Sequence, residues 1–412
     1  MGLRASRLAF THDEAFTYNH YISKPLGTIL EFDGPERSNN HLVNTLLAKV
    51  SGHFLGKREL PLRLPNLAAF AVYLVFAWLL LCRRAPPLVA LSGYVLASAN
   101  PLLLEMFGLC RGYGLSIAFL VAALFLADRA LERPPAAHLE AGALAILGVG
   151  VLAQLVLVDS YAALLLILGA NAAQGPRRAR RLFAMAAVTL ALAAAVVPIV
   201  RLFASAGFYH AGATHGFFED TVKGTIFYSF MRAPYAGWAR PAALGVVVAC
   251  LALSAGTALV LLARRGENGA ERATLGLAAL PFLSAAAALT QSALLHTGSL
   301  RDRTALFFVP LFAFAATAAL GWLASRNGGL HLVVSTAAAV LALASLVHLA
   351  RVANTRESFL WWFDADDRRV IDDLTRLHGA RPIRLGVTWY FEPSLNFYRV
   401  TRRLDWLSPI TR

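Results

Sequence analysis

Four small groups of charged and aromatic residues lie beside apolar segments of this sequence, and their residue types could support chemistry. In chain order they are His12-Asp13-Glu14, Arg111-Gly112-Tyr113, Asp159 with Tyr161, and His296 with Arg301-Asp302-Arg303. Arginines can hold an anionic group while a neighbouring carboxylate takes a proton. Together, these residues could therefore bind a phosphate and remove a proton beside it.

Each group also has a simpler interpretation. An Asp-Glu pair such as Asp13-Glu14 is most often a solvated turn, and arginines at the ends of apolar segments usually anchor to lipid phosphates. His12 and His41 could bind a divalent metal with this pair, but their spacing matches no metal signature, so we expect no cofactor. Asp159 is harder to dismiss, because a carboxylate beside apolar sequence needs a water-filled cavity or a partner.

The composition of the whole chain indicates a membrane protein. Of the 412 residues, 58% are hydrophobic and 15% are charged, whereas soluble proteins carry about 25% charged residues. No single soluble core could bury so much apolar sequence. The net charge of +14 does not indicate a nucleic-acid partner, because most basic residues lie in short loops between apolar segments or in the C-terminal tail. Cys82, Cys110 and Cys250 form neither a disulfide framework nor a metal spacing.

The apolar segments have the length of membrane helices, since about 20 apolar residues cross the hydrocarbon layer. The segments 140–156 and 159–174 form one long apolar run, which we interpret as a helical hairpin with its tip at Asp159, because a single helix would be too long. The sequence predicts about ten membrane helices: 64–82, 87–104, 113–131, 140–156, 159–174, 182–201, 241–263, 274–296, 304–324 and 330–350.

The distribution of arginines predicts the orientation of these helices. Basic residues gather after the first, third, fifth, seventh and ninth of them, and cytoplasmic loops are the ones enriched in Arg and Lys. The 12 residues are Arg83, Arg84, Arg129, Arg133, Arg177, Arg178, Arg180, Arg181, Arg264, Arg265, Arg272 and Arg326. This pattern predicts a multi-pass protein of the cytoplasmic (inner) membrane, with its long polar segments outside the cytoplasm.

The same reading divides the chain into three parts. Residues 1–61 are predicted to be a first extracytoplasmic loop with an interfacial helix over 39–55, and 62–350 the transmembrane bundle. Residues 351–412 are predicted to be a small extracytoplasmic α/β tail: a helix over 364–378, alternating strand residues from Ile383 to Trp389, and a second helix from Pro393. No apolar signal segment precedes the first loop. Either an upstream membrane helix is missing from this sequence, which we expect, or the first helix exports its own N-terminus.

Short motifs across residues 10–325 occur in the order found in one known family. They are Asp13-Glu14, Asn40-His41 before an amphipathic stretch, Glu59-Leu60-Pro61-Leu62-Arg63-Leu64-Pro65, Asn100-Pro101-Leu102, Arg111-Gly112-Tyr113, and Arg303 ahead of Pro310. The sequence thus resembles the GT-C superfamily of integral-membrane glycosyltransferases, in the branch of glycosyltransferase family 39 with the protein O-mannosyltransferases and lipid A aminoarabinose transferases. The sequence departs from that branch by lacking its first membrane helix and the extra soluble domains of true O-mannosyltransferases.

The resemblance implies an all-α GT-C bundle that transfers a sugar, with inversion, from a polyprenyl-phosphate donor at the outer membrane face. The acceptor, a hydroxyl of a lipid, glycan or protein, stays open. By position, Asp13 would be the general base, and arginines would stabilise the charge of the leaving phosphate. The residues expected at the site are Asp13 and Glu14 as catalytic groups; Arg111, Tyr113, Arg301 and Arg303 as ligands of the donor phosphate; and His41, Asp159 and Tyr161 as supporting residues.

Two other functional classes fit the sequence. A transporter or flippase of a lipid-linked sugar would also be a multi-pass protein, but transporters commonly show internal repeats and polar residues at the membrane midplane. Here we find no convincing repeat, and the polar residues gather on one face. A catalytically inactive assembly protein with the same fold is the third interpretation.

Overall fold

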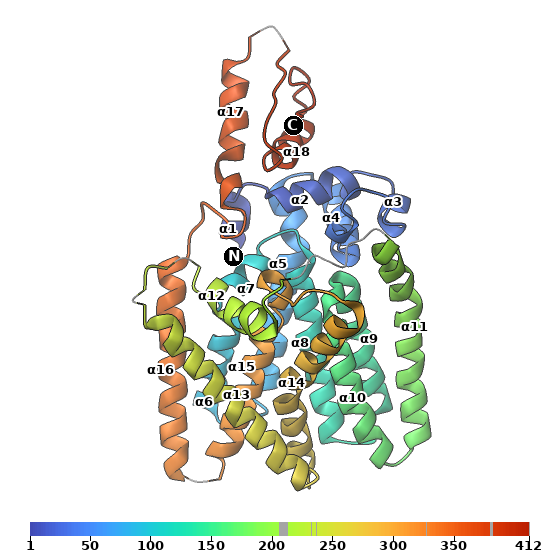
Figure 1. The fold of residues 1–412 in the computed structure, drawn as a ribbon, viewed down its shortest axis with the longest axis vertical. Helices are drawn as coiled ribbons and strands as arrows, with labels where there is room; N and C mark the ends of the chain where they lie inside the picture. Colours follow the sequence, from blue (N-terminus) through green and yellow to red (C-terminus); the bar gives the residue numbers. More distant parts are fainter. Residues whose placement is uncertain (206–212, 232, 236, 327, 380–381, 412) are drawn as a thin grey trace. The chain divides into compact units, whose positions relative to one another are not determined.

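The computed structural model describes residues 1–205, 213–231, 233–235, 237–326, 328–379 and 382–411. Its elements are helices and short helical turns (Figure 1). The chain divides into two compact units. Unit 1 comprises Met1–Phe70, Glu105–Leu115 and Ala353–Arg412, and unit 2 comprises Ala71–Leu104 and Ser116–Val352.

Unit 1 joins the start of the chain to its end. Its core contains Phe10, which stacks on Phe397 with the ring centroids 4.1 Å apart, and the buried side chains of Ile371 and Tyr398. Its elements are α1 (Gly2–Arg7), α2 (His12–Thr17), η1 (Tyr18–Ile22), α3 (Leu26–Leu30), η2 (Arg37–Asn39), α4 (Leu42–Leu55), the first turns of α5 (Glu59–Leu81), η7 (Trp362–Asp366), α17 (Asp367–Leu377) and α18 (Glu392–Thr401). The predicted helices at 39–55, at 364–378 and after Pro393 are therefore present.

The strand predicted in the tail is not formed. Within the described part of the tail, pairing is limited to two isolated parallel bridges, Ile383 with Leu407 and Gly386 with Thr411. Ile383, Leu385 and Val387 do pack against the core of unit 1, so their alternation correctly indicated one buried face. Single bridges do not make a ladder, because a two-stranded pair is marginal even when it is continuous.

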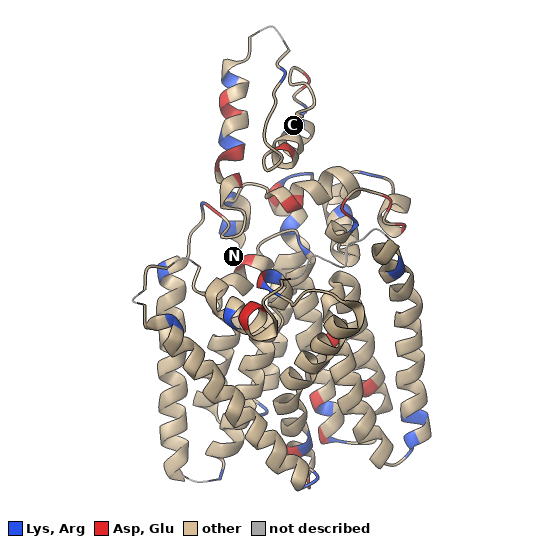
Figure 2. Cartoon of the chain, in the orientation of Figure 1, with Lys and Arg blue, Asp and Glu red and all other residues tan. Residues whose placement is uncertain are grey.

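Unit 2 is a bundle of long apolar helices, and Figure 2 shows their charged residues mostly at or near helix ends. Its elements are the rest of α5, α6 (Pro87–Ser98), α7 (Pro101–Phe107, which ends in unit 1), α8 (Gly112–Glu132, which begins in unit 1), α9 (Ala137–Ala153), η3 (Leu155–Leu157), α10 (Val158–Gln174), α11 (Arg178–Ser205), η5 (Phe217–Lys223), α12 (Gly224–Ser229), α13 (Ala239–Ala263), α14 (Gly269–Leu295), η6 (Asp302–Ala305), α15 (Phe308–Ala324) and α16 (Gly328–Val352).

The predicted number of membrane helices needs correction. All ten predicted segments are helical, but among the described residues eight helices are long and apolar enough to span a membrane. A ninth span forms only if α6 and α7 count as one, and they are bent by 62° ahead of Pro101, which cannot continue the backbone hydrogen bonds of a helix. The tenth segment, α9, is shorter, with 17 residues. Its hairpin with α10 turns at Gln154, whose backbone is extended, rather than at Asp159.

Ion pairs gather the arginine-rich loops at one end of unit 2. Arg84 binds Asp128 at 2.7 Å and donates to the Ala270 carbonyl at 3.2 Å. Arg326 lies 3.5 Å from Glu271, at the start of α14. The loops after the first, third, seventh and ninth predicted helices therefore share one end, as the arginine distribution predicted.

A close helix contact gives a first testable result. A Cβ added to Gly93 on α6 would overlap Thr317 on α15, whose hydroxyl is buried and bonded to the Ala313 carbonyl. We expect Gly93→Ala to lower the free energy of unfolding by about 1–3 kcal/mol, measured as a lower unfolding temperature in detergent. Gly169→Ala on α10 is the control, because nothing lies within 4 Å of its added Cβ. Equal effects of the two substitutions would contradict the packing of α6 on α15.

Candidate functional site

Asp13 and Arg111 form the centre of the candidate site in unit 1. Asp13 lies in the first turn of α2, which begins after Thr11 in a capping box that Glu14 completes. Arg111 Nη2 lies 3.3 Å from Asp13 Oδ2, and the same guanidinium donates to Thr17 Oγ1 at 3.0 Å and Asn39 Oδ1 at 2.8 Å. With 1% of its surface exposed, Arg111 is held by unit 1 itself and balances the charge of the Asp13 carboxylate.

Glu14 has a different environment from its neighbour. Its carboxylate and the Arg63 guanidinium are both fully buried, with Nη2–Oε2 and Nε–Oε1 distances of 2.6 and 2.8 Å. Arg63 also donates to the carbonyls of Ala5, Leu8 and Ala9, which close the turn after α1. Of the two adjacent carboxylates, only Asp13, whose side chain is 11% exposed, can meet a substrate hydroxyl without rearrangement.

His41 and Tyr113 lie beside Arg111. The rings of His41 and Tyr113 meet edge to face with centroids 5.1 Å apart, and the Arg111 guanidinium carbon lies 5.9 Å from the Tyr113 ring centroid. The structure thus brings together four predicted site residues, Asp13, His41, Arg111 and Tyr113, from segments about 100 residues apart.

The environment of Cys110 does not support nucleophilic chemistry at its thiol. Burial raises the pKa of Cys110 to about 12, so this thiol stays protonated. His12 Nδ1 lies 2.8 Å from the Tyr390 carbonyl, which can only accept, so this nitrogen carries the hydrogen. Across the described ranges, no group of three or more His, Cys, Asp or Glu side chains is arranged to hold a metal ion.

Sequence reasoning missed the contribution of the tail to this site. Asp364 Oδ2 accepts a hydrogen bond from the His12 backbone amide at 2.6 Å, immediately before Asp13. The carbonyl of Tyr390 holds the His12 ring, so two tail residues fix the start of α2. The only signal in the sequence was the run of aspartates at the start of the predicted 364–378 helix.

The remaining predicted residues belong to unit 2. Arg301 is exposed and pairs with Asp302 at 3.5 Å, and Arg303 follows in η6. Asp159 is buried in the first turn of α10, and Tyr161 Oη forms a hydrogen bond with Thr189 Oγ1 at 3.0 Å. Tyr161 therefore lies where α10 packs on α11.

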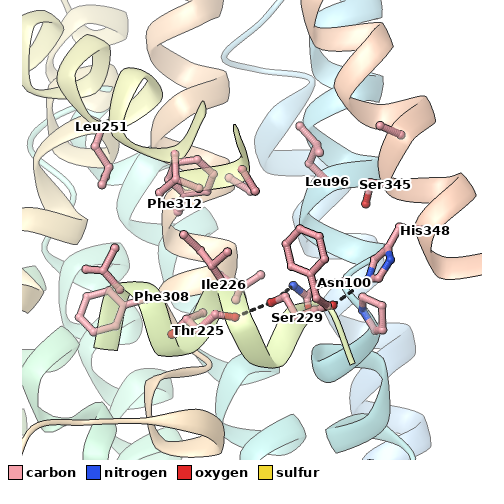
Figure 3. Close-up of a pocket in the computed structure, with 18 of the residues that line it drawn as sticks. Leu96, Asn100, Thr225, Ile226, Ser229, Leu251, Phe308, Phe312, Ser345 and His348 are labelled. Atoms are coloured by element: carbon pink, nitrogen blue, oxygen red, sulfur yellow. Dashed lines mark hydrogen bonds between the residues drawn. The ribbon is translucent and has the colours of Figure 1, made fainter. Parts of the chain in front are cut away.

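Unit 2 also encloses a pocket of about 650 Å³, which the sequence did not predict. Elements α6, η5, α12, α13, α14, α15 and α16 line it with mostly apolar side chains. In Figure 3, Leu251, Phe308 and Phe312 lie on one side, and Asn100, Ser229 and His348 meet on the other.

The polar side of the pocket is a hydrogen-bonded cluster. Asn100 donates to Ser229 Oγ at 2.8 Å, and His348 contacts the Ser229 carbonyl and Tyr235 Oη, each at 2.8 Å. Thr221, on the pocket wall, donates to the Leu300 carbonyl at 2.6 Å, next to Arg301. Elements η5 and α12, between the predicted helices 182–201 and 241–263, thus form part of the pocket wall and bind the segment that carries the arginines.

Comparison with known proteins rests on structure, since neither a protein-family model nor a curated protein matches the sequence. ArnT from Cupriavidus metallidurans in the apo state aligns with a TM-score of 0.54 and 12% identity, over 95% of this chain and 81% of that chain. ArnT bound to undecaprenyl phosphate aligns with a TM-score of 0.55 and 11% identity, over 99% of this chain and 86% of that one. This chain has the GT-C fold. The GT-C architecture predicted from the short motifs is therefore confirmed, as is the multi-pass membrane character of the bundle.

Proposed function

We propose that the protein is a membrane glycosyltransferase that moves a sugar from a polyprenyl-phosphate-linked donor to an acceptor hydroxyl. The observation that carries this proposal is the GT-C fold, which aligns over 99% of this chain with an ArnT structure that holds undecaprenyl phosphate. The resemblance of the short motifs to the same superfamily supports it independently.

In this proposal, unit 2 binds the donor. Its pocket has the volume and apolar lining of small-molecule sites, and it suits part of a hydrocarbon chain. Arg301 and Arg303 would bind the phosphate, because guanidinium groups form paired, charge-assisted hydrogen bonds with phosphate oxygens. The Thr221–Leu300 bond supports this assignment, since it joins the pocket wall to the arginine segment.

Asp13, in unit 1, is the proposed base. Asp13 would take the proton of the attacking hydroxyl, while the phosphate leaves without needing an acid. A single displacement of this kind inverts the configuration at the transferred sugar carbon. Arg111 and Tyr113 would then act through Asp13 rather than on the phosphate, because Arg111 already binds Asp13, Thr17 and Asn39.

The proposed location of the reaction is the extracytoplasmic side of the cytoplasmic membrane. Four arginine-rich loops share one end of unit 2, and that end would face the cytoplasm by the positive-inside rule. Residues 297–303 follow α14 and precede α15, so they lie at the other ends of these two helices.

The proposal is tested with purified protein in proteoliposomes that contain a polyprenyl phosphate carrying a radiolabelled sugar. We expect sugar to leave the lipid and polyprenyl phosphate to accumulate in proportion to protein. Passage of the intact lipid-linked sugar across the bilayer, with its glycosidic bond unbroken, would instead identify a transporter.

A matched pair of substitutions tests the pocket. Ala285 on α14 lines the pocket, whereas its exposed neighbour Ala286 does not. We expect Ala285→Phe to raise the KM for the lipid donor by about tenfold, corresponding to about 1.4 kcal/mol of lost binding, because the ring occupies space needed by the chain. Ala286→Phe should leave the KM unchanged. Similar KM values for both variants would remove the pocket from the donor site.

A further inference from the structure

Two buried carboxyl groups of the tail contact each other beside α2. Asp364, in η7, is 1% exposed, and Asp367, at the start of α17, is 3% exposed. The two carboxyl groups interact with each other, and the Oδ1 atom of Asp364 is buried with no other hydrogen-bond partner among the described residues. Within the described residues neither has a cationic partner, since the adjacent Arg368 pairs with Glu59 at 2.6 Å.

Such a pair cannot carry two negative charges without a large cost. Like charges in contact and out of water disfavour the doubly ionised state, so one proton is retained between them. The partners of the other oxygens restrict where that proton can lie. Asp364 Oδ2 accepts from the His12 amide, and Asp367 Oδ2 accepts from the Ser394 hydroxyl, which leaves the hydrogen between the two carboxyl groups.

We propose that Asp364 and Asp367 share one proton, and that this protonated pair is a positioning element that holds the start of α2, and with it Asp13, in place. The inference deepens the proposed function, on which it rests, by adding the C-terminal tail to the site. Asp364 does not touch the substrate in this scheme. It acts through the His12 amide, one residue before the proposed base.

The local structure explains why α2 needs this support. The helix begins at His12 and continues directly into η1, so its first turn is the end whose backbone amides lack partners within the helix. Its first turn is held by the Thr11–Glu14 capping box, by the Asp364 bond and by the bond from His12 to the Tyr390 carbonyl. The last two bonds come from the tail, so a displaced tail would displace Asp13.

The shared proton makes the position of Asp13 sensitive to alkaline pH. Burial raises the pKa of Asp364, and the neighbouring Asp367 and Asp13 raise it further; burial also raises the pKa of Asp367. A folded state that keeps a proton which the unfolded chain releases loses stability as pH rises above the ordinary aspartate range. The groups that face the pair are His12 and Asp13 from α2, Asp366 from η7 and Ser394 from α18.

The test compares Asp364→Asn with Asp364→Ala in the full-length protein. An asparagine mimics the protonated acid, because its NH₂ can donate to Asp367 while its oxygen accepts from His12. We expect the wild type to lose kcat at alkaline pH, whereas Asp364→Asn should keep the neutral-pH value there. Asp364→Ala should lose about a hundredfold in kcat at every pH, the size of effect that a 1 Å misplacement can cause, with little change in donor KM. Asp405→Asn, at an exposed position elsewhere in the tail, should behave as the wild type.

A second measurement does not depend on transfer activity. Hydrogen exchange of the first residues of α2 should speed up at alkaline pH in the wild type and at all pH values in Asp364→Ala, but not in Asp364→Asn. We also expect the wild type at neutral pH to show an infrared band of a protonated carboxylic acid, and Asp364→Asn to lack this band. An unprotonated pair at neutral pH, or identical alkaline profiles of the wild type and Asp364→Asn, would overturn the inference. Absence of transfer in every variant, with the exchange pattern as expected, would refute only the proposed function.

Discussion

Replacement of Asp13 by Asn should lower the kcat for sugar transfer by about 10²- to 10⁴-fold, the usual contribution of a positioned general base. Asparagine keeps the size of the side chain but cannot accept the proton of the acceptor hydroxyl. The donor KM should change little, because Asp13 is proposed to act on the acceptor hydroxyl and not to bind the donor. The measurement is initial-rate kinetics of radiolabelled sugar transfer in proteoliposomes.

A matched control guards against a folding defect. Arg111 retains its bonds to the Asp13 carbonyl, Thr17 and Asn39 in the variant, so unit 1 should stay folded. Asp33→Asn, at an exposed position of the same unit, should leave kcat unchanged. Wild-type kcat in Asp13→Asn, with the Asp33 variant equally active, would remove Asp13 from the mechanism.

The second large effect concerns stability rather than catalysis. Glu14→Gln and Arg63→Met, made singly, should each lower the free energy of unfolding by about 3–5 kcal/mol, because each leaves one partner charged and buried. The Glu14–Arg63 pair is fully buried and bonds to the turn after α1, so its loss should loosen all of unit 1. The readout is the unfolding temperature and yield of purified protein in detergent.

The double variant Glu14→Gln/Arg63→Met separates the pair from its other contacts. If the two side chains act on each other, the double variant should lose much less than the sum of the single losses. Additive losses would show that they act independently. Arg301→Gln, which removes an exposed guanidinium of unit 2, should leave the unfolding temperature unchanged.

The sequence by itself determined the multi-pass membrane character of the protein, the approximate positions of its long apolar helices and the shared end of four of its arginine-rich loops. These features are local, because each span must be apolar along its own length and must satisfy its own backbone hydrogen bonds in lipid. Helix lengths depend on finer detail. The bend before Pro101 and the turn at Gln154 changed the count, although both residues are visible in the sequence.

Only the tertiary structure decided what each charged residue does. Asp13 and Glu14 are adjacent and chemically alike, but successive side chains on a helix point about 100° apart. Packing placed Glu14 against Arg63 in the interior of unit 1 and left Asp13 partly exposed beside Arg111.

The tail and the pocket also depend on contacts that could not be predicted from the sequence. Asp364 lies about 350 residues from His12, and the pocket is lined by segments from Leu96 to Arg351. The alternating residues from Ile383 predicted a strand. In the described part of the tail they pack against the core of unit 1 but form only isolated bridges, not a continuous ladder. Contacts between distant segments depend on how whole helices pack, and the local pattern of residue types does not contain that information.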